Sequence, residues 1–179
     1  MQNDTHQWVA IYTNPRAEKK AAERLQELGY ESYLPLLHKQ HRWSDRWKIV
    51  EVPMIPSYIF AKICTRDVVP VRAADGVSYI VSWRGKPAII SNKEIEAMRR
   101  IADADAEVYI RNNELLKKGA HVKITGGQFA GLEGDLVSNC EEGNFCISIT
   151  GLDFCMVMQV EGALLQPIES KKKEKGIWD

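Results

Sequence analysis

Four cysteines and a His-x-x-His pair are the residues of this chain whose types could support chemistry most directly. The cysteines include no C-x-x-C pair, so we interpret them as reduced, mostly buried thiols and not as a zinc site or disulfides. They are Cys64, Cys140, Cys146 and Cys155. His38 and His41 have a spacing that occurs in metal sites, but the sequence around them offers no further ligands, which favours a surface pair. We therefore expect no metal and no cofactor.

A glycine-rich segment, GGQFAGLEG at 126–134, is the next candidate, because glycine-rich loops can cradle phosphate groups. It lacks the Lys-Ser/Thr pair with which a P-loop holds phosphates and Mg²⁺. The chain also contains no G-x-S-x-G elbow, no H-E-x-x-H motif and no recognisable Cys-His pairing. The sequence therefore indicates a protein that is not an enzyme.

Three cations suggest contact with phosphate groups. Arg16, Lys20 and Arg24 are spaced by four, which predicts one basic ridge along the first helix. Like charges at this spacing cost a few tenths of a kcal/mol, and a plain solvated face could avoid that cost. Lys19 and Glu23 can pair and dilute the charge. Nucleic-acid contact and a solvated face both remain open for this ridge.

A second basic segment, 38–48, interleaves cations and aromatic residues with a single acid, Asp45. Such a mixture suits stacking on unpaired bases, and it equally suits a protein surface. The alternative is that one tryptophan packs on the domain and the charges only keep the strands soluble. The residues that we select here for nucleic-acid contact are Arg42, Trp43, Arg46 and Trp47.

These candidates must be positioned by the first hundred residues, in which predicted strands and helices alternate. The buried strand WVAIYT is followed by Asn14-Pro15, which predicts the cap and the first residue of a helix that Gly29 ends. Ser91-Asn92 predicts the start of another helix. We expect a short helix near 66–74 and further strands at 31–37, 38–43, 47–52, 54–63, 77–83 and 87–90. Residues 7–104 thus predict an α+β sandwich with an antiparallel sheet.

Residues 115–169 predict a second, small, all-β domain. Val122 and Ile124 alternate with polar residues, and the four glycines within 126–134 would each cost a helix about 1 kcal/mol. The pattern is typical of an SH3-like barrel held by turns. Residues 105–114 lack a clean period and predict a linker, whereas 170–179 are too polar to fold and predict a flexible charged tail.

The charge distribution restricts the partners of the barrel. Residues 1–100 carry 16 Lys+Arg against 11 Asp+Glu, whereas residues 101–179 carry 8 against 13. Residues 115–170 hold three lysines against seven acids. A barrel that grips rRNA should be strongly basic, so an acidic one favours a protein partner. The chain opens without a cationic and apolar leader and has no membrane-length apolar run, so we expect a cytoplasmic protein.

The order of these segments resembles that of the NusG/RfaH family of transcription elongation factors. KKGAHVKITGGQFAGLEGDLV resembles a KOW motif, and WVAIYT, a helix, a basic hairpin and VPMIPSYIF together look like the NusG N-terminal domain. WSDRWK and VSWRGKPAII look most like the UpxY-type antiterminators, which act on polysaccharide operons. The resemblance therefore implies a transcription elongation and antitermination factor. The rival interpretation is a ribosomal or RNA-binding KOW protein.

This resemblance also implies the partners. The matching family positions place Tyr12, Ile55, Pro56 and Tyr58 around a binding site for RNA polymerase. The resemblance also matches Lys20 and Arg24 to positions that contact the non-template DNA strand. The KOW barrel would recruit a ribosomal protein or a termination factor; Phe129 and Leu132 are our candidates, with barrel packing as the alternative for Phe129. We expect a monomer without membrane contact, and a KOW domain that refolds as helices is a minority alternative.

Overall fold

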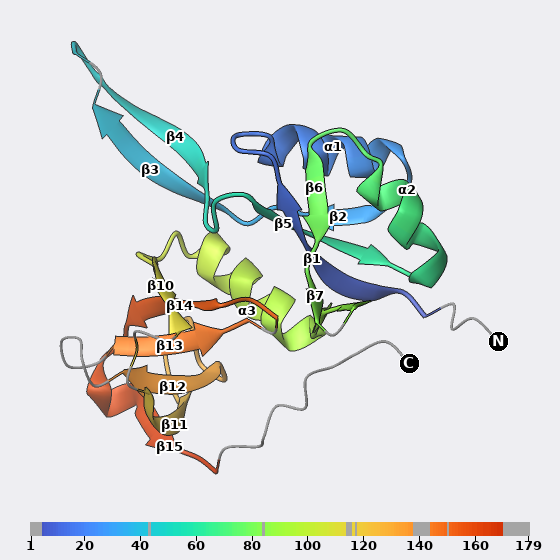
Figure 1. Ribbon diagram of the computed structural model, residues 1–179. Helices are drawn as coiled ribbons and strands as arrows, with labels where there is room; N and C mark the ends of the chain where they lie inside the picture. Colours follow the sequence, from blue (N-terminus) through green and yellow to red (C-terminus); the bar gives the residue numbers. More distant parts are fainter. Residues whose placement is uncertain are drawn as a thin grey trace.

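The computed structural model confirms the expected α+β class, with an α/β domain followed by a small all-β domain (Figure 1). The residues that the structure describes are 5–42, 44–83, 85–113, 116, 118–137, 144–149 and 151–169. The predicted tail, 170–179, lies outside them. None of the described helices is both long enough and apolar enough to cross a membrane.

An antiparallel sheet forms the centre of the first domain. Its strand order is β2-β5-β1-β6, and β9 also pairs with β1. These strands are β1 (Gln7–Thr13), β2 (Glu31–Tyr33), β5 (Tyr58–Ile63), β6 (Val77–Ile80) and β9 (Ile89–Ile90). Every described residue of β1 from Trp8 to Ile11 is buried, so apolar residues cover both faces of this central strand.

Helices pack on both faces of this sheet. One hydrophobic cluster joins Val9 and Ile11 of β1 to Leu25 of α1 (Glu18–Glu27) and Val71 of α2 (Val68–Arg72). The other face meets α3 (Asn92–Asp103), which lies between the sheet and the second domain (Figure 1). The short 3-10 helix η1 (Thr65–Asp67) precedes α2.

The start of α3 agrees with the sequence, because Ser91 and Glu94 form a reciprocal capping box. Glu94 N donates to Ser91 Oγ at 3.3 Å, and Ser91 N donates to Glu94 Oε2 at 2.8 Å. These bonds satisfy two backbone groups that a helix start otherwise leaves without partners.

Replacing Ser91 by alanine is therefore expected to lower the free energy of unfolding by about 1 kcal/mol, because the cap is lost. Urea denaturation followed by circular dichroism measures this change. Ser91→Thr keeps a capping hydroxyl and should lose much less. Equal losses in the two variants would show that the capping bond does not stabilise α3.

The first helix begins later than its sequence predicts. Ala17 N donates to Asn14 O at 3.0 Å, and Asn14 N donates to Gly76 O at 3.0 Å, so residues 14–17 form a turn. Arg16 has a φ of 62°, which is left-handed and not helical. The helix starts at Glu18, and the prediction that Arg16 lies on it is wrong.

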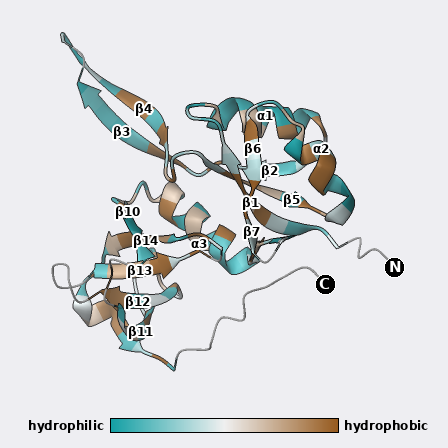
Figure 2. Ribbon diagram, viewed as in Figure 1, coloured by the Kyte–Doolittle hydropathy of each residue, from teal (hydrophilic) through white to brown (hydrophobic). Residues whose placement is uncertain are grey.

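A long two-stranded hairpin projects from the first domain (Figure 1). It consists of β3 (Leu36–Arg42) and β4 (Trp47–Pro53), close to the predicted strands at 38–43 and 47–52, and Leu36 pairs with Pro53 at its base. The predicted strand at 31–37 is divided, because β2 ends at Tyr33 and Leu36 and Leu37 begin β3. The hairpin strand β3 is largely hydrophilic, whereas β4 carries a hydrophobic part (Figure 2). A smaller pair, β7 (Ser82–Trp83) and β8 (Lys86–Pro87), lies between β6 and β9 in the chain.

The second domain is a six-stranded antiparallel barrel-like sheet with the order β10-β14-β13-β12-β11-β15. Its strands are β10 (Tyr109–Asn112), β11 (Lys118–Ile124), β12 (Glu133–Val137), β13 (Asn144–Ser148), β14 (Phe154–Gln159) and β15 (Leu165–Pro167), and the 3-10 helix η3 (Gly162–Leu164) precedes β15. Residues 109–112, which the sequence assigns to the linker, pair with β14 and belong to this sheet. The predicted linker is therefore shorter than 105–114.

The two domains share one hydrophobic cluster. Phe60 of the sheet, Met98 of α3 and Phe145 of the barrel all belong to it. Arg100 Nη2 donates to the backbone oxygen of Gln128 at 2.6 Å, which joins α3 to the glycine-rich loop of the barrel. The barrel is thus packed against the first domain along the side that α3 and β5 present.

Candidate functional site

Three tyrosines from three adjacent strands form an aromatic cluster on the first domain. The Tyr12 and Tyr79 rings stack with centroids 5.0 Å apart, and the Tyr12 and Tyr58 rings meet edge to face at 5.1 Å. The cause is strand register, since Tyr12 is the direct partner of Tyr58 on β5 and of Tyr79 on β6. Tyr79 is 45% exposed. Large, rigid aromatic side chains of this kind are favoured at protein interfaces.

The barrel covers part of this cluster. The Phe154 ring at the start of β14 meets the Tyr58 ring edge to face, with centroids 5.2 Å apart. Burial is the main cause that raises the pKa of Tyr58 to about 12, and the neighbouring Tyr79, Tyr12 and Asp153 contribute to the same increase. Tyr58 is therefore a neutral phenol at physiological pH and offers a ring and a hydroxyl without charge.

The segment before β5 differs from the predicted strand at 54–63. Tyr58 N donates to Ile55 O at 3.3 Å, and Ser57 has a φ of 63°, so residues 55–58 form a turn. Glu18 Oε1 accepts a bond from Ser57 N at 2.9 Å and holds this turn against α1. Pro56 is exposed beside the cluster, but Ile55 is only 1% exposed and belongs to the shared hydrophobic cluster. In this structure Ile55 offers almost no surface to a partner.

The basic residues of α1 lie on an exposed face. Lys20 and Arg24 are one helical turn apart and both are exposed, while Arg24 Nη1 donates to Glu27 Oε2 at 2.9 Å. Lys19 pairs with Glu51 of β4 at 2.8 Å, not with Glu23 as the sequence suggested. The ridge is therefore reduced to two cations on the helix, with Arg16 on the turn before it.

The hairpin presents the other predicted nucleic-acid contacts. The Arg42 guanidinium lies 5.9 Å from the centre of the Trp47 ring, and Trp47 and Ile49 are each 64% exposed. Arg46 is exposed at the turn, whereas Trp43 lies outside the described residues. A cation over a solvent-facing indole is a ready surface for stacking a base or an apolar side chain.

A hydrogen bond and the Lys19–Glu51 ion pair hold the hairpin to the rest of the domain. His38 N donates to Asp105 Oδ1 at 2.7 Å, and its imidazole lies 3.8 Å from Glu51 Oε1. The hydrogen bond from Lys19, together with its positive charge, lowers the pKa of Glu51. Within the described residues, His38 thus lies on the surface between the carboxylates of Glu51 and Asp105.

The two residues of the barrel that we predicted to contact a partner, Phe129 and Leu132, differ in how far they are exposed. Phe129 is half-buried and packs against the shared cluster, which agrees with the alternative of barrel packing. Leu132, the other candidate, is only 8% exposed and offers a partner almost no surface in this structure. The loop could not expose Leu132 because its backbone returns into the sheet: Gly131 N donates to Ile124 O at 2.7 Å.

The described cysteines are free and buried, as the sequence predicts: Cys64, Cys146 and Cys155. Cys140 lies outside the described residues. Cys146 and Cys155 form a hydrogen-bonded thiol pair on adjacent strands; this bond lowers the pKa of Cys146, and it raises that of Cys155 together with burial. Sequence reasoning missed one group, in which His6 lies beside Cys64 and Asp67.

The fold and these surfaces define a two-domain protein whose first domain presents aromatic rings and cations on its surface. Residues 6–99 match the family described as "Transcription termination factor nusG". The chain therefore belongs to the NusG family of transcription factors. No curated protein sequence matches it.

Two solved structures are similar to the chain. The first is described as "Domain interaction in Thermotoga maritima NusG"; it has a TM-score of 0.52 and 20% identity, with 92% of this chain and 98% of that chain covered. The second, from the "MjSpt4:Spt5 complex", has a TM-score of 0.31 and 15% identity, with 92% of this chain and 99% of that chain covered. The first supports the fold described above.

Proposed function

We propose that this protein is a transcription elongation and antitermination factor that binds RNA polymerase through Tyr12, Pro56 and Tyr58 of its first domain. The observation that carries the proposal is the three-tyrosine cluster. Tyr12 and Tyr58 are half-buried and stand at positions that the NusG resemblance implies, and Tyr79, which stacks on Tyr12, is 45% exposed. Ile55 would support this surface indirectly, because it is buried in the turn at 55–58 that precedes Tyr58.

The test is a pull-down of core RNA polymerase by the full chain, followed by a transcription assay on a template with a strong pause. Binding together with a shorter pause supports the proposal. Failure to bind polymerase, together with retention on ribosomes or rRNA, would support the rival ribosomal function. The acidic composition of residues 115–170 argues against that rival, since phosphate neutralisation supplies most rRNA affinity.

Contact with the non-template DNA strand is the second part of the proposal. Lys20 and Arg24 share an exposed face of α1, and Arg42 with Trp47 offers a cation and a ring on the hairpin. Phosphates would bind the helix cations, while unpaired bases would stack on the hairpin.

The double variant Lys20→Ala/Arg24→Ala is expected to reduce the salt dependence of binding to an elongation complex. Each lost single-strand phosphate contact lowers the slope of log K against log salt by about 0.7, so the expected decrease is about 1.4. Titrations at several salt concentrations measure it. Lys123→Ala removes an exposed cation from the barrel and serves as the matched control. An unchanged slope in the double variant would exclude these cations from DNA contact.

We further propose that the barrel recruits a protein, such as a ribosomal protein or a termination factor, and that the chain is a specialised paralogue acting on polysaccharide operons. WSDRWK and VSWRGKPAII support the specialised role. Because Arg100 and the shared cluster hold the loop with Phe129 against the first domain, that loop would reach a partner only after the barrel separates. Read-through of a polysaccharide operon leader, compared with an unrelated terminator, tests the specialised role.

A further inference from the structure

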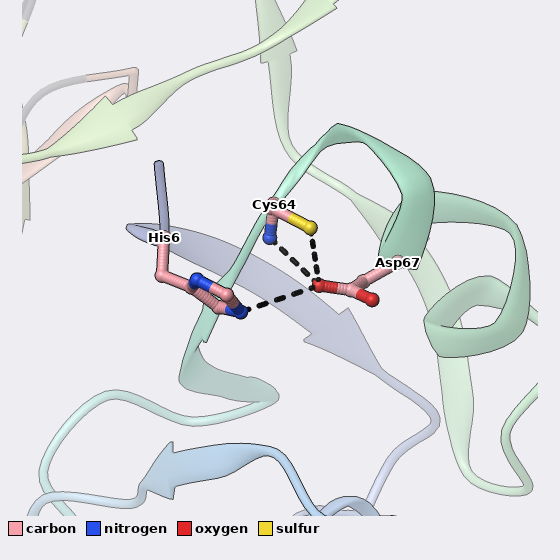
Figure 3. A group of neighbouring side chains, drawn as sticks. All are labelled: His6, Cys64 and Asp67. Atoms are coloured by element: carbon pink, nitrogen blue, oxygen red, sulfur yellow. Dashed lines mark hydrogen bonds and ion pairs between the residues drawn. The ribbon is translucent and has the colours of Figure 1, made fainter. Parts of the chain in front are cut away.

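Three side chains able to bind metal meet where β1 begins and β5 ends (Figure 3). They are His6, Cys64 and Asp67. Tyr12 and Tyr58 pair at the opposite end of the same two strands. The strand register brings the three side chains together, because Gln7 of β1 pairs with Ile63 of β5 and thereby places the preceding residue, His6, beside Cys64. Asp67 follows at the end of η1. Their ligand atoms all lie within 4.8 Å of one another.

We propose that His6, Cys64 and Asp67 form a binding site for a divalent metal ion of the zinc class. An imidazole nitrogen, a thiolate and a carboxylate are the ligands that Zn²⁺ accepts, and they suit Mg²⁺ or Ca²⁺ poorly because those ions prefer oxygen. Asp67 Oδ2 lies 2.9 Å from Cys64 Sγ and 3.9 Å from His6 Nε2. Small side-chain rotations would bring these atoms to the separations of a tetrahedral site.

The charges of the group fit a doubly charged cation. Asp67 Oδ2 accepts hydrogen bonds from the thiol and from the backbone N–H of Cys64, so a carboxylate oxygen already lies beside the sulfur. Metal binding releases the Cys64 thiol proton to water and forms a thiolate–metal bond, so the two anions balance the ion.

Room for a fourth ligand adjoins the group. A pocket of about 410 Å³ opens beside it, lined by His6, Gly29, Tyr30, Glu31, Lys62 and Asp67. A water molecule could complete four-coordination from this pocket. The nearby Lys62 ammonium would oppose a cation, but Glu31 Oε2 lies 3.6 Å from it and offsets its charge.

A purely structural role for Cys64 and Asp67 is the competing explanation. Cys64 caps η1, and its thiol and its backbone N–H both donate to Asp67 Oδ2. Serine would perform this capping at least as well, since a hydroxyl is a better hydrogen-bonding group than a thiol. The cap also gives no role to His6, which lies on another segment of the chain.

The substitution Cys64→Ser separates the two explanations, because it keeps the cap and removes the thiolate. Full-length protein under reducing conditions is titrated with Co²⁺ and then with Zn²⁺, with absorption spectroscopy and calorimetry as the readouts. We expect one Co²⁺ per chain with a near-ultraviolet thiolate-to-cobalt band, displaced by Zn²⁺. Cys64→Ser should lose the band, and His6→Gln should weaken binding by more than about 100-fold, given that outer-shell changes alone cost about 10–100-fold.

Two matched controls remove a thiol and an imidazole elsewhere. Cys155→Ser and His121→Gln should bind Co²⁺ as the unchanged protein does, since Cys155 lies in β14 and His121 pairs with Asp135 in the barrel. Absence of the thiolate band, or equal binding by Cys64→Ser and the unchanged protein, would overturn the proposal, as would loss of binding only in His121→Gln. These outcomes are independent of polymerase binding and therefore leave the proposed function untouched.

Discussion

Tyr58→Ala is expected to weaken binding of core RNA polymerase by about 30-fold, equivalent to about 2 kcal/mol. Tyr58 touches Tyr12 within the cluster and Phe154 of the barrel, so its ring is central to the surface that we propose for polymerase. A central aromatic residue commonly supplies an energy of this size when its contact surface is desolvated. Calorimetry or surface plasmon resonance with core polymerase measures the loss.

Three variants make this result specific. Tyr58→Phe keeps the ring and should retain most of the affinity. Phe154→Ala removes the same interdomain contact but keeps Tyr58, so it should not weaken binding. Tyr109→Ala removes another exposed tyrosine, on β10, and should have no effect. Unchanged binding by Tyr58→Ala would refute the assignment of the site.

Gly134→Val is expected to destabilise the barrel by about 3 kcal/mol or more, because overpacking a closed core forces its neighbours to move. Gly134 lies in β12, and a Cβ atom at this position would come within 2.6 Å of the ring of Phe145, which is fully buried. It would also collide with the backbone oxygen of Cys146, which cannot rotate away as a side chain can. Urea denaturation, with hydrogen exchange to identify which domain opens, measures the effect.

Gly162→Ala is the matched control, since a Cβ atom there meets nothing within 4 Å. It should change the free energy of unfolding by less than about 0.5 kcal/mol. A Gly134→Val protein as stable as the control would contradict the close packing of β12 against β13.

Features that depend on neighbouring residues could be predicted from the sequence. The hairpin at 36–53 follows from strand propensity around a polar turn, and the start of α3 follows from Ser91 and Glu94, which lie within one helical turn. The α+β class and the small barrel follow from the same local patterns. In each case the deciding interaction spans only a few positions of the chain.

Features decided by distant residues could not be predicted in this way. Arg16 lies outside the helix, in a turn that begins at Asn14, and the Asn14 backbone is bonded to the distant Gly76. Ile55 is buried, because a turn replaces the first part of the predicted strand. The grouping of His6 with Cys64 needs the register of β1 on β5, and no spacing in the sequence encodes that pairing directly. The sequence did not predict β10, because Tyr109–Asn112 lack a regular apolar pattern and form a strand by pairing with the distant β14.

The contact between Phe154 and Tyr58 has a thermodynamic consequence if polymerase binds where we propose. Polymerase would then bind only molecules whose barrel has separated from the first domain. The apparent dissociation constant for polymerase would equal the intrinsic constant divided by the fraction of such molecules. Any molecule that captures the free barrel would raise that fraction and hence the affinity for polymerase. By reciprocity, polymerase would raise the affinity of the barrel for that molecule by the same factor, so the two partners would bind cooperatively without touching each other.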